Sequence, residues 1–249
     1  MLKRERQNLI LEQLLYKSRV LSSELSVELK VSEYTIRRDL NELSQEGKIL
    51  KVHGGALATS QHLFSFHEQD ILDHEKKLII AKKALSLIKN NDVLFIGGGT
   101  TNLELVNVLP KNLNVTIFTY SLPVAMRLSE HPKADVILFG GKLMKNAQIV
   151  IGPDMMSEIG NIRADLCFLG VCGIELNQGV TEIDWEVAQL KRKIISVSDQ
   201  NVLLTTSEKI NTRHRFMVSD LQNISTLVTE IEPTERIFQE YIRRGVSIL

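Results

Sequence analysis

The sequence contains little cysteine, few aromatic residues and no long apolar run. With two cysteines in 249 residues, it does not match a disulfide-rich secreted domain. Cys167 and Cys172 lie in an apolar stretch without a matching set of Cys or His, so we expect buried thiols. No run of about 18 uncharged apolar residues occurs, and charges interrupt the segment MLKRERQNLILEQLLYK, so neither a membrane span nor a signal peptide is predicted. We expect a cytoplasmic protein without metal or cofactor.

An excess of charge is also absent, because 30 Lys and Arg balance 30 Asp and Glu. A large basic excess often marks nucleic-acid binding, and its absence makes the distribution of charge more informative than the total. Residues 1–60 carry a net charge of +2 and the rest −2. The length suits one or two domains, each able to bury a core.

The first 48 residues have the apolar spacing of three short helices. The apolar positions are Leu11, Leu14 and Leu15, then Leu21, Leu25 and Leu29, then Ile36, Leu40 and Leu43. Ser22 or Ser23 can cap the second helix, Ser32 the third, and Gly47 can end it. Only residues 30 and 31 separate the second helix from the third, which is typical of a helix-turn-helix. Residues 48–57 around His53-Gly54-Gly55 predict a two-stranded wing with a glycine turn.

The third predicted helix has a polar face opposite its apolar one. At about 100° per residue, Tyr34, Arg37, Arg38 and Asn41 point away from the core direction of Ile36. Arginine and asparagine can pair with bases and arginine with phosphate, so this face suits the major groove of DNA. The alternative is a merely solvated face on which the arginines pair with acids, the candidates being Glu33, Asp39 and Glu42.

From residue 92 onward, short β-rich runs alternate with helical segments. Strands are expected at 92–96, 114–119, 134–139, 164–170, 201–205 and 225–229, and helices at about 75–90, 101–109, 122–130, 153–161 and 184–199. Apolar strands separated by helices indicate a mostly parallel sheet covered on both faces. Glycines and hydroxyls follow the strand ends, where open α/β sheets bind ligands. Gly97 to Thr101 is a glycine turn leading into a helix, and its free N–H groups suit an anion.

The stretch from Arg6 to Ala58, with VSEYTIRRDLNELSQEGKILKVHGGA at its centre, resembles the DeoR-type bacterial transcriptional regulators. The resemblance continues through EKKLIIAKKAL, GGGTTNLELVNVL, VILFGGKL, ADLCFLGVCGI and WEVAQLKRKII. It implies an α/β protein with an N-terminal winged helix-turn-helix and a sensor domain similar to sugar-phosphate isomerases. It further implies a repressor of carbohydrate-metabolism genes, whose affinity for double-stranded operator DNA responds to a phosphorylated sugar or related metabolite. A homodimer or homotetramer is also implied.

On this basis we expect a DNA-binding domain at residues 1–58, a linker at 59–75 and an effector-sensing domain at 76–249. The expected DNA contacts are Ser22, Ser32, Tyr34, Thr35, Arg37, Arg38, Asn41, Lys48, Lys51 and His53. The expected effector site consists of Gly97, Gly98, Gly99, Thr100, Thr101, Tyr120, Ser121, Gly140, Gly141, Gly170, Lys191, Thr206 and Lys209. Arg192 is a further cationic candidate, and either it or Lys191 could instead lie on a solvated face.

The chain departs from the family pattern at three places. The glycine turn typically follows Asp-Ser, where this chain has Gly97-Gly98, and the second strand typically ends in Thr-Asn-Ser, where Tyr120 takes the middle position. An Asp typically stands three residues before a Lys, and here Thr206 precedes Lys209. We expect an effector that differs from a typical sugar phosphate, or weakened sensing, with Tyr120 narrowing the pocket.

Two other functions remain open from the sequence. A sugar-phosphate isomerase or deaminase needs a general base, and the available acids are Glu175, Glu182, Asp184 and Glu186. A winged-helix protein that binds DNA without responding to a ligand is the second alternative.

Overall fold

The computed structural model describes residues 2–17, 19–58 and 73–249, except that the side chains of 12, 15–17 and 58 are left out. The chain divides into two compact units, Met1–Glu68 and Gln69–Leu249. Most of the expected linker, residues 59–72, lies outside the described residues. Helix α5 (His74–Leu85) follows its N-cap residue Asp73. The helix therefore begins within the expected linker, two residues before the expected start of the second domain at residue 76.

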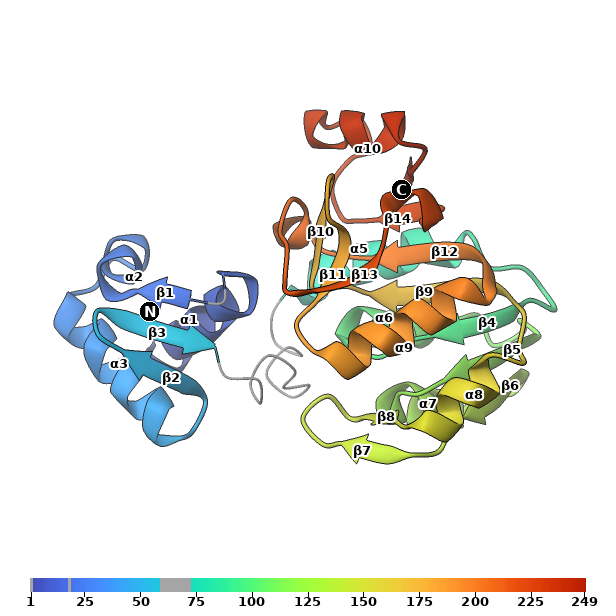
Figure 1. Ribbon diagram of the computed structural model, residues 1–249, viewed down its shortest axis with the longest axis horizontal. Coiled ribbons are helices and arrows are strands. Elements are labelled where there is room, and N and C mark those ends of the chain that lie inside the picture. Colours follow the sequence, from blue (N-terminus) through green and yellow to red (C-terminus); the bar gives the residue numbers. More distant parts are fainter. Residues whose placement is uncertain (1, 18, 59–72) are drawn as a thin grey trace. The chain divides into compact units, whose positions relative to one another are not determined.

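The first unit contains three helices and a small antiparallel sheet (Figure 1). Its elements are α1 (Lys3–Lys17), β1 (Arg19–Leu21), α2 (Ser22–Glu28), α3 (Glu33–Gln45), β2 (Ile49–Val52) and β3 (Gly55–Ala58). The three helices and the β2–β3 wing confirm the prediction. A third strand, β1, was missed, and Leu21, expected on a helix face, ends this strand and is 42% exposed. Gly55 permits the pairing, because a Cβ atom there would lie 2.0 Å from the Val20 carbonyl oxygen.

The ends of the helices follow the predicted chemistry in α3 but not in α2. Ser32 caps α3, with its hydroxyl accepting the Thr35 N–H at 3.2 Å. Gly47, at a φ of 73°, ends α3, and its N–H donates to the Ser44 carbonyl at 3.0 Å. The cap predicted at Ser22 or Ser23 is wrong, since Leu21 is the N-cap of α2 and no side chain caps it.

The core of the first unit lies between the three helices and the sheet, and includes Ile10, Leu14, Leu25, Ile36, Leu40 and Leu43. One ion pair is buried beside it. Arg6 of α1 donates from Nε to Asp39 Oδ2 at 2.5 Å and from Nη2 to Oδ1 at 3.2 Å. This bidentate pair links α1 to α3, and the two side chains are 11% and 1% exposed.

The second unit is built on a seven-stranded sheet of order β15-β14-β12-β9-β4-β5-β6, with every neighbouring pair parallel. Its strands are β4 (Val93–Ile96), β5 (Val115–Thr119), β6 (Ala134–Leu138), β9 (Ala164–Gly170), β12 (Ser198–Leu204), β14 (Thr226–Val228) and β15 (Ser247–Ile248). The mostly parallel sheet and its six predicted strands are confirmed. The two-residue β15 was missed because it is too short to show a pattern.

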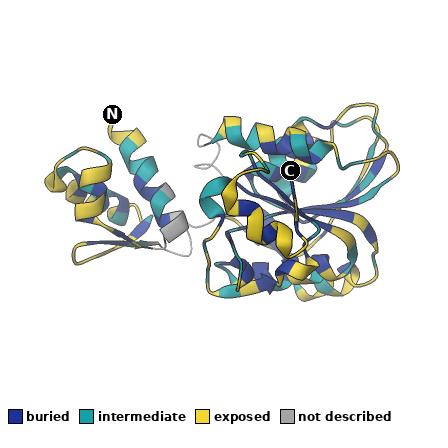
Figure 2. Cartoon of the chain, turned by 90° about the horizontal axis from the view of Figure 1, so that it is seen from above, coloured by how far each residue is buried: buried dark blue, intermediate teal, exposed yellow. Residues whose placement is uncertain are grey.

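Helices cover both faces of this sheet (Figure 2). α5, α6 (Thr100–Asn107) and α7 (Leu122–Leu128) pack on one face, and α8 (Pro153–Ile159) and α9 (Trp185–Ser196) on the other. Because side chains alternate along a strand, Leu94 and Ile96 of β4 face the first layer and Phe95 the second. The chain ends near α10 (Gln239–Arg243).

Several short elements complete the second unit and were not predicted. They are the hairpin β7 (Lys142–Met144) and β8 (Ile149–Ile151), the sheet of β10 (Gly173–Glu175), β11 (Gly179–Glu182) and β13 (Phe216–Ser219), and the 3-10 turns η1 (Ser207–Lys209), η2 (Leu221–Asn223) and η3 (Arg236–Phe238). Cys167 is fully buried as expected, and burial raises its pKa to about 12, whereas Cys172 is only partly buried. No helix within the described ranges is long and apolar enough to cross a membrane.

Candidate functional site

Helix α3 presents a polar face to solvent. Tyr34 is 80% exposed, and the side chains of Arg37 and Arg38 are 63% and 70% exposed. On the opposite face, Ile36 and Leu40 are fully buried. The predicted orientation of the helix is therefore confirmed.

The two arginines make exposed ion pairs on their own helix. Arg37 Nη2 lies 2.9 Å from Glu33 Oε2, and Arg38 Nε lies 3.5 Å from Glu42 Oε1. Such pairs typically contribute only about 0.3–0.5 kcal/mol, so they do not prevent the guanidinium groups from binding phosphate or bases. The third suggested acid, Asp39, is instead paired with Arg6.

The wing adjoins this face through one hydrogen bond. Lys51 of β2 donates from Nζ to Asn41 Oδ1 at 2.5 Å. Lys51 and His53 are exposed, and Lys48 is half-buried, with its ammonium 3.4 Å from Glu46. Guanidinium, amide and ammonium groups thus meet on one surface of the first unit.

Three other residues expected at this surface have structural positions in the first unit. Ser22 is only 4% exposed, so we leave it out of the proposed contact surface. Ser32 caps α3, and its Oγ lies 2.9 Å from Thr35 Oγ1. These two hydroxyls therefore fix the start of the helix.

In the second unit, the glycine turn after β4 leads directly into α6. Gly97 donates its N–H to the Phe168 carbonyl at 2.9 Å, and Gly99 has a φ of 100°. The first-turn N–H groups of a helix have no acceptor within the helix, and they carry the positive end of its dipole. The geometry therefore suits an anion at this turn.

Unpartnered polar atoms gather at the carboxyl ends of three strands. Asn102 Oδ1, Ser121 Oγ, Thr206 Oγ1 and Glu208 Oε2 are buried and have no hydrogen-bond partner in the described part of the chain. Asn102 is held by its other amide atom, Nδ2, which donates to the Gly98 carbonyl at 2.9 Å. An unsatisfied buried polar group costs about 1–3 kcal/mol, so four near one sheet edge favour a bound polar ligand.

Tyr120, directly after β5, fills the space beside the glycine turn. It is 2% exposed, and its phenol oxygen lies 2.8 Å from the position of a Cβ atom at residue 97. Burial raises the pKa of Tyr120 more than the nearby Lys191 ammonium lowers it, so the phenol is neutral at physiological pH.

Lys191 lies inside the unit and not on a solvated face. It is 8% exposed, donates to the Gly170 carbonyl at 2.7 Å and forms an ion pair with Glu182 of β11. Burial alone would lower the pKa of Lys191, but the Glu182 carboxylate raises it above its usual value. Glu182 also accepts a hydrogen bond from Cys172 Sγ at 2.9 Å, so its charge is used within the fold. This pairing was missed because strand β11 was not predicted.

Lys209 follows β12 at the same end of the sheet and, unlike Lys191, is in no ion pair of the described residues. It ends η1, and no carboxylate in the described ranges lies within ion-pair distance of its ammonium. The neighbouring Glu208 forms an ion pair with Lys76 through Oε1, whereas its Oε2 is buried without a partner. Glu230 accepts the Ser207 N–H at 3.1 Å.

Gly140 and Gly141 have a different setting from the glycine turn. A Cβ at Gly140 would enter open space, whereas a Cβ at Gly141 would lie 2.6 Å from the Ile151 carbonyl oxygen. Gly141 therefore permits the close packing of the β7–β8 hairpin. This hairpin brings Ile149 against the glycine turn, since a Cβ at Gly98 would lie 2.7 Å from Ile149 Cγ2.

Three of the four acids considered as a general base have structural roles. Asp184 caps α9 by accepting the Glu186 and Val187 N–H groups at 2.9 and 3.1 Å, and Glu175 accepts the Gln178 N–H at 3.1 Å. Glu182 is paired with Lys191, so three of the four candidate acids already have partners within the fold.

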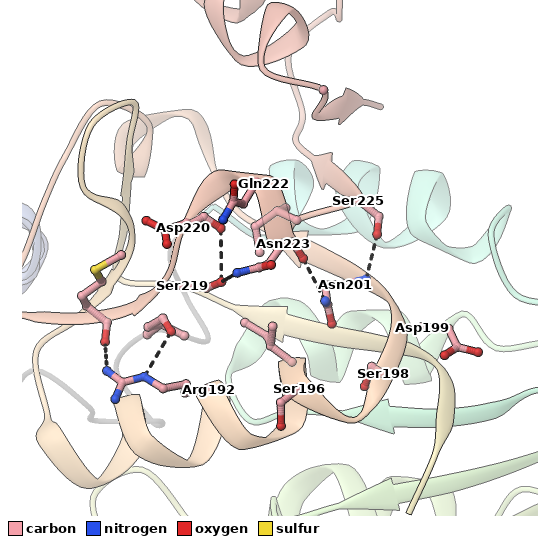
Figure 3. A pocket seen from close by; sticks show the side chains of 15 residues that line it. Arg192, Ser196, Ser198, Asp199, Asn201, Ser219, Asp220, Gln222, Asn223 and Ser225 are labelled. Atoms are coloured by element: carbon pink, nitrogen blue, oxygen red, sulfur yellow. Dashed lines mark hydrogen bonds between the residues drawn. The ribbon is translucent and has the colours of Figure 1, made fainter.

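A separate hollow of about 790 Å³ lies where β12 and β14 begin, and not at their carboxyl ends (Figure 3). Arg192 lies at its border and donates to the Met217 carbonyl at 2.5 Å, so it does not join the glycine turn. Asn201 donates to the Asn223 carbonyl at 2.8 Å, and its N–H donates to Ser225 Oγ at 3.1 Å. The polar groups that dashed lines join in Figure 3 are hydrogen-bonded mainly to one another.

Comparison with known families gives a match for each unit. A family described as a DeoR-like helix-turn-helix domain matches residues 6–62, and one described as a DeoR C terminal sensor domain matches residues 72–231.

Similar proteins match over almost their whole lengths. The HTH-type transcriptional regulator GolR of Listeria innocua serovar 6a is 32% identical over 98% of this chain and 97% of its own. The glycerol-3-phosphate regulon repressor of Escherichia coli K12 is 31% identical over 94% of both chains. The HTH-type transcriptional repressor GlcR of Bacillus subtilis is 29% identical over 100% of this chain and 96% of its own.

Among solved structures, a ribose 5-phosphate isomerase A from Methanocaldococcus jannaschii covers 54% of this chain and 53% of its own, with 19% identity and a TM-score of 0.39. A match this distant carries no argument about activity.

Proposed function

This chain belongs to the DeoR family of transcriptional regulators, and we propose that it represses carbohydrate-metabolism genes through the exposed face of α3. It is a DNA-binding transcriptional regulator, and the enzyme alternative is set aside because its full-length relatives are named as regulators. We place its action in the cytoplasm.

One observation carries the proposed mode of DNA binding. Arg37, Arg38 and Asn41 lie together on the exposed face of α3, and Lys51 of the wing is bonded to Asn41. We propose that α3 enters the major groove, with Arg37, Arg38 and Asn41 at base edges or phosphates. Tyr34, Thr35, Ser32, Lys48, Lys51 and His53 complete the proposed contact surface.

The second part of the proposal is a sensor site at the carboxyl ends of the sheet. We propose that a phosphorylated metabolite binds at the glycine turn Gly97–Thr101, with the unpartnered oxygens of Asn102, Ser121 and Thr206. Tyr120, Gly170, Lys191 and Lys209 form the rest of this site. Gly140 and Gly141 belong to it indirectly, through the hairpin that places Ile149 on Gly98.

A single winged helix contacts few phosphates, so we propose that two or more copies bind spaced half-sites. A homodimer or homotetramer would supply them. Sedimentation of the full-length chain with and without operator DNA would test this, and a monomer on each half-site at binding saturation would contradict it.

Binding by the full-length chain to duplexes selected from a random library tests the DNA-binding surface. We expect Arg37→Ala and Arg38→Ala each to weaken binding roughly tenfold or more, as the loss of a base or phosphate contact does. Arg243→Ala in α10 is the matched control, because Arg243 is also 70% exposed and paired with a neighbouring acid, Glu240.

Two results would contradict the proposal. If both α3 variants bind like the wild type while folding normally, the assigned face is wrong. If no sugar phosphate changes the affinity for the selected duplex, the chain is a ligand-independent DNA-binding protein.

A further inference from the structure

Helix α5 begins where the chain enters the described part of the second unit, with Asp73 as its N-cap residue. In sequence, residues 59–72 join Asp73 to the end of β3 in the first unit. A structural change that is passed along the backbone between the two units therefore passes through Asp73. The side-chain contacts of the first turn of α5 decide whether a change at the sensor edge reaches this residue.

Lys76, in the first turn of α5, holds two carboxylates at once. Its ammonium forms an ion pair with Glu208 of η1 and lies 3.3 Å from Asp73 Oδ1. Burial would lower the pKa of Lys76, but the two carboxylates raise it above its usual value, so the ammonium stays charged. Asp73 has a φ of 58°, and its side chain makes no capping hydrogen bond within the described residues. Its carboxylate therefore pairs with Lys76 instead of fixing the start of the helix.

Glu208 has a second oxygen that nothing in the described part of the chain binds. Oε1 pairs with Lys76, whereas Oε2 is buried without a hydrogen-bond partner. Thr206, the N-cap residue of η1, also has an unpartnered buried oxygen. Leaving such an acceptor unpaired is unfavourable, which favours a ligand whose hydroxyl group donates to Oε2. The Glu208 carboxylate would then be shared between the ligand and Lys76.

The two ends of α5 are held in different ways. Lys83, in the last turn, donates to the carbonyl oxygen of Thr229 at 2.9 Å, just after β14. The first turn is held to its neighbours by charged and titratable side chains. Besides the Lys76 pairs, His74 Nδ1 lies 3.4 Å from Glu104 Oε1 of α6, the helix that follows the glycine turn. Side chains exchange partners without breaking backbone hydrogen bonds, so the first turn is the part of α5 suited to respond to a ligand.

From these contacts we propose that Lys76 is a relay between the sensor edge and the entry of the chain at Asp73. A hydroxyl group of the bound metabolite donates to Glu208 Oε2, the pair between Lys76 and Glu208 weakens, and the ammonium moves toward Asp73. The ligand-bound and ligand-free states then differ at the residue where the second unit begins. The inference rests on the proposed sensor function and adds the route by which the ligand acts on DNA binding.

The response of DNA binding to a sugar phosphate tests this relay. The affinity of the full-length chain for the selected duplex is measured by anisotropy with and without glycerol 3-phosphate, fructose 6-phosphate or glucose 6-phosphate. The compound with the largest effect on the wild type is used for every variant. Calorimetry without DNA measures the binding of that compound separately.

Lys76→Gln removes the ammonium from both carboxylates and should imitate the ligand-bound state. Without the compound, we expect its affinity for the duplex to lie within threefold of the affinity that the wild type has with the compound. Adding the compound should change this affinity less than threefold, while calorimetry shows binding at least as tight as in the wild type. Lys76→Arg keeps the charge and should keep the wild-type response.

Asp73→Asn tests the entry side of the relay alone. Asparagine has the same size and also tolerates a positive φ, so the substitution removes only the pair with Lys76. We expect the compound to bind within threefold of the wild type and its effect on DNA affinity to fall at least threefold. Arg163→Gln is the control, because it breaks an exposed ion pair with Asp199 at the opposite sheet edge, where β9 and β12 begin.

The outcomes separate this inference from the proposed function. A wild-type response in Lys76→Gln or in Asp73→Asn would overturn the relay and leave the sensor standing, and so would an equal loss of response in Arg163→Gln. If Lys76→Gln fails to fold, as judged by Trp185 fluorescence, Asp73→Asn decides the question. Failure of all three compounds to bind the wild type or change its DNA affinity would contradict the sugar-phosphate sensor itself, and the relay with it.

Discussion

The phenol oxygen of Tyr120 occupies the space that a side chain at Gly97 would need, 2.8 Å from the Cβ position at residue 97. In the sequence these residues are two separate departures from the family pattern. In the structure they are complementary, because the larger residue after β5 fits only against a glycine after β4. The turn therefore keeps its shape although both positions differ.

This contact predicts a coupling between the two positions. Gly97→Ala should lower the free energy of unfolding by about 1–3 kcal/mol, and by less in a Tyr120→Phe background, which removes the phenol oxygen. Urea unfolding followed by the fluorescence of Trp185, the single tryptophan, reports on this unit. Gly140→Ala is the control, because nothing lies within 4 Å of its new Cβ. Equal losses in both backgrounds would show that the two residues are independent.

The buried pair between Arg6 and Asp39 predicts a stability effect confined to the first unit. Asp39→Ala leaves the Arg6 guanidinium buried without its carboxylate, and should destabilise this unit by about 3 kcal/mol or more. The Asp39 hydrogen bond raises the pKa of Arg6, so the arginine stays charged at any working pH. Hydrogen exchange of α3 amides should rise while Trp185 unfolding is unchanged. Unaltered exchange in α3 would show that the pair does not hold α1 to α3.

Lys51 and Asn41 are hydrogen-bonded to each other, but we expect their side chains to contribute differently to DNA binding. Lys51→Ala should weaken binding similarly for all sequences and reduce the slope of log affinity against log salt by about 1, as the loss of a phosphate contact does. Asn41→Ala should mainly relax the base preference at one position. Anisotropy titrations at several salt concentrations measure the slope, and repeated selection measures the preference. The reverse pattern would exchange the two assignments.

His214 predicts a pH dependence of stability. Burial lowers the pKa of His214, so as pH falls through about 6.5 the unfolded chain takes up the proton first. The free energy of unfolding should therefore be highest above that pH and fall as the pH is lowered toward the folded pKa. Urea unfolding at pH 5.5–7.5, followed by Trp185 fluorescence, measures this slope. His214→Gln should flatten it, and an unchanged slope would assign the effect to other groups.

Local periodicity was enough to predict the longer helices and strands and to orient the surface of α3. Helical spacing places Ile36, Leu40 and Leu43 inward, and this alone sends Arg37, Arg38 and Asn41 outward. The apolar strands between helices likewise predict the parallel sheet, and with it the edge where Gly97 and Thr206 lie.

Contacts between residues far apart in the chain could be known only from the folded structure. No local pattern pairs Glu182 with Lys191, fits Tyr120 against Gly97 or adds β1 to the wing, because each depends on which elements become neighbours. Short strands such as β11 carry too few residues for a period, so their side chains could not be assigned in advance. Periodicity fixes which way a side chain points, whereas packing fixes what it meets.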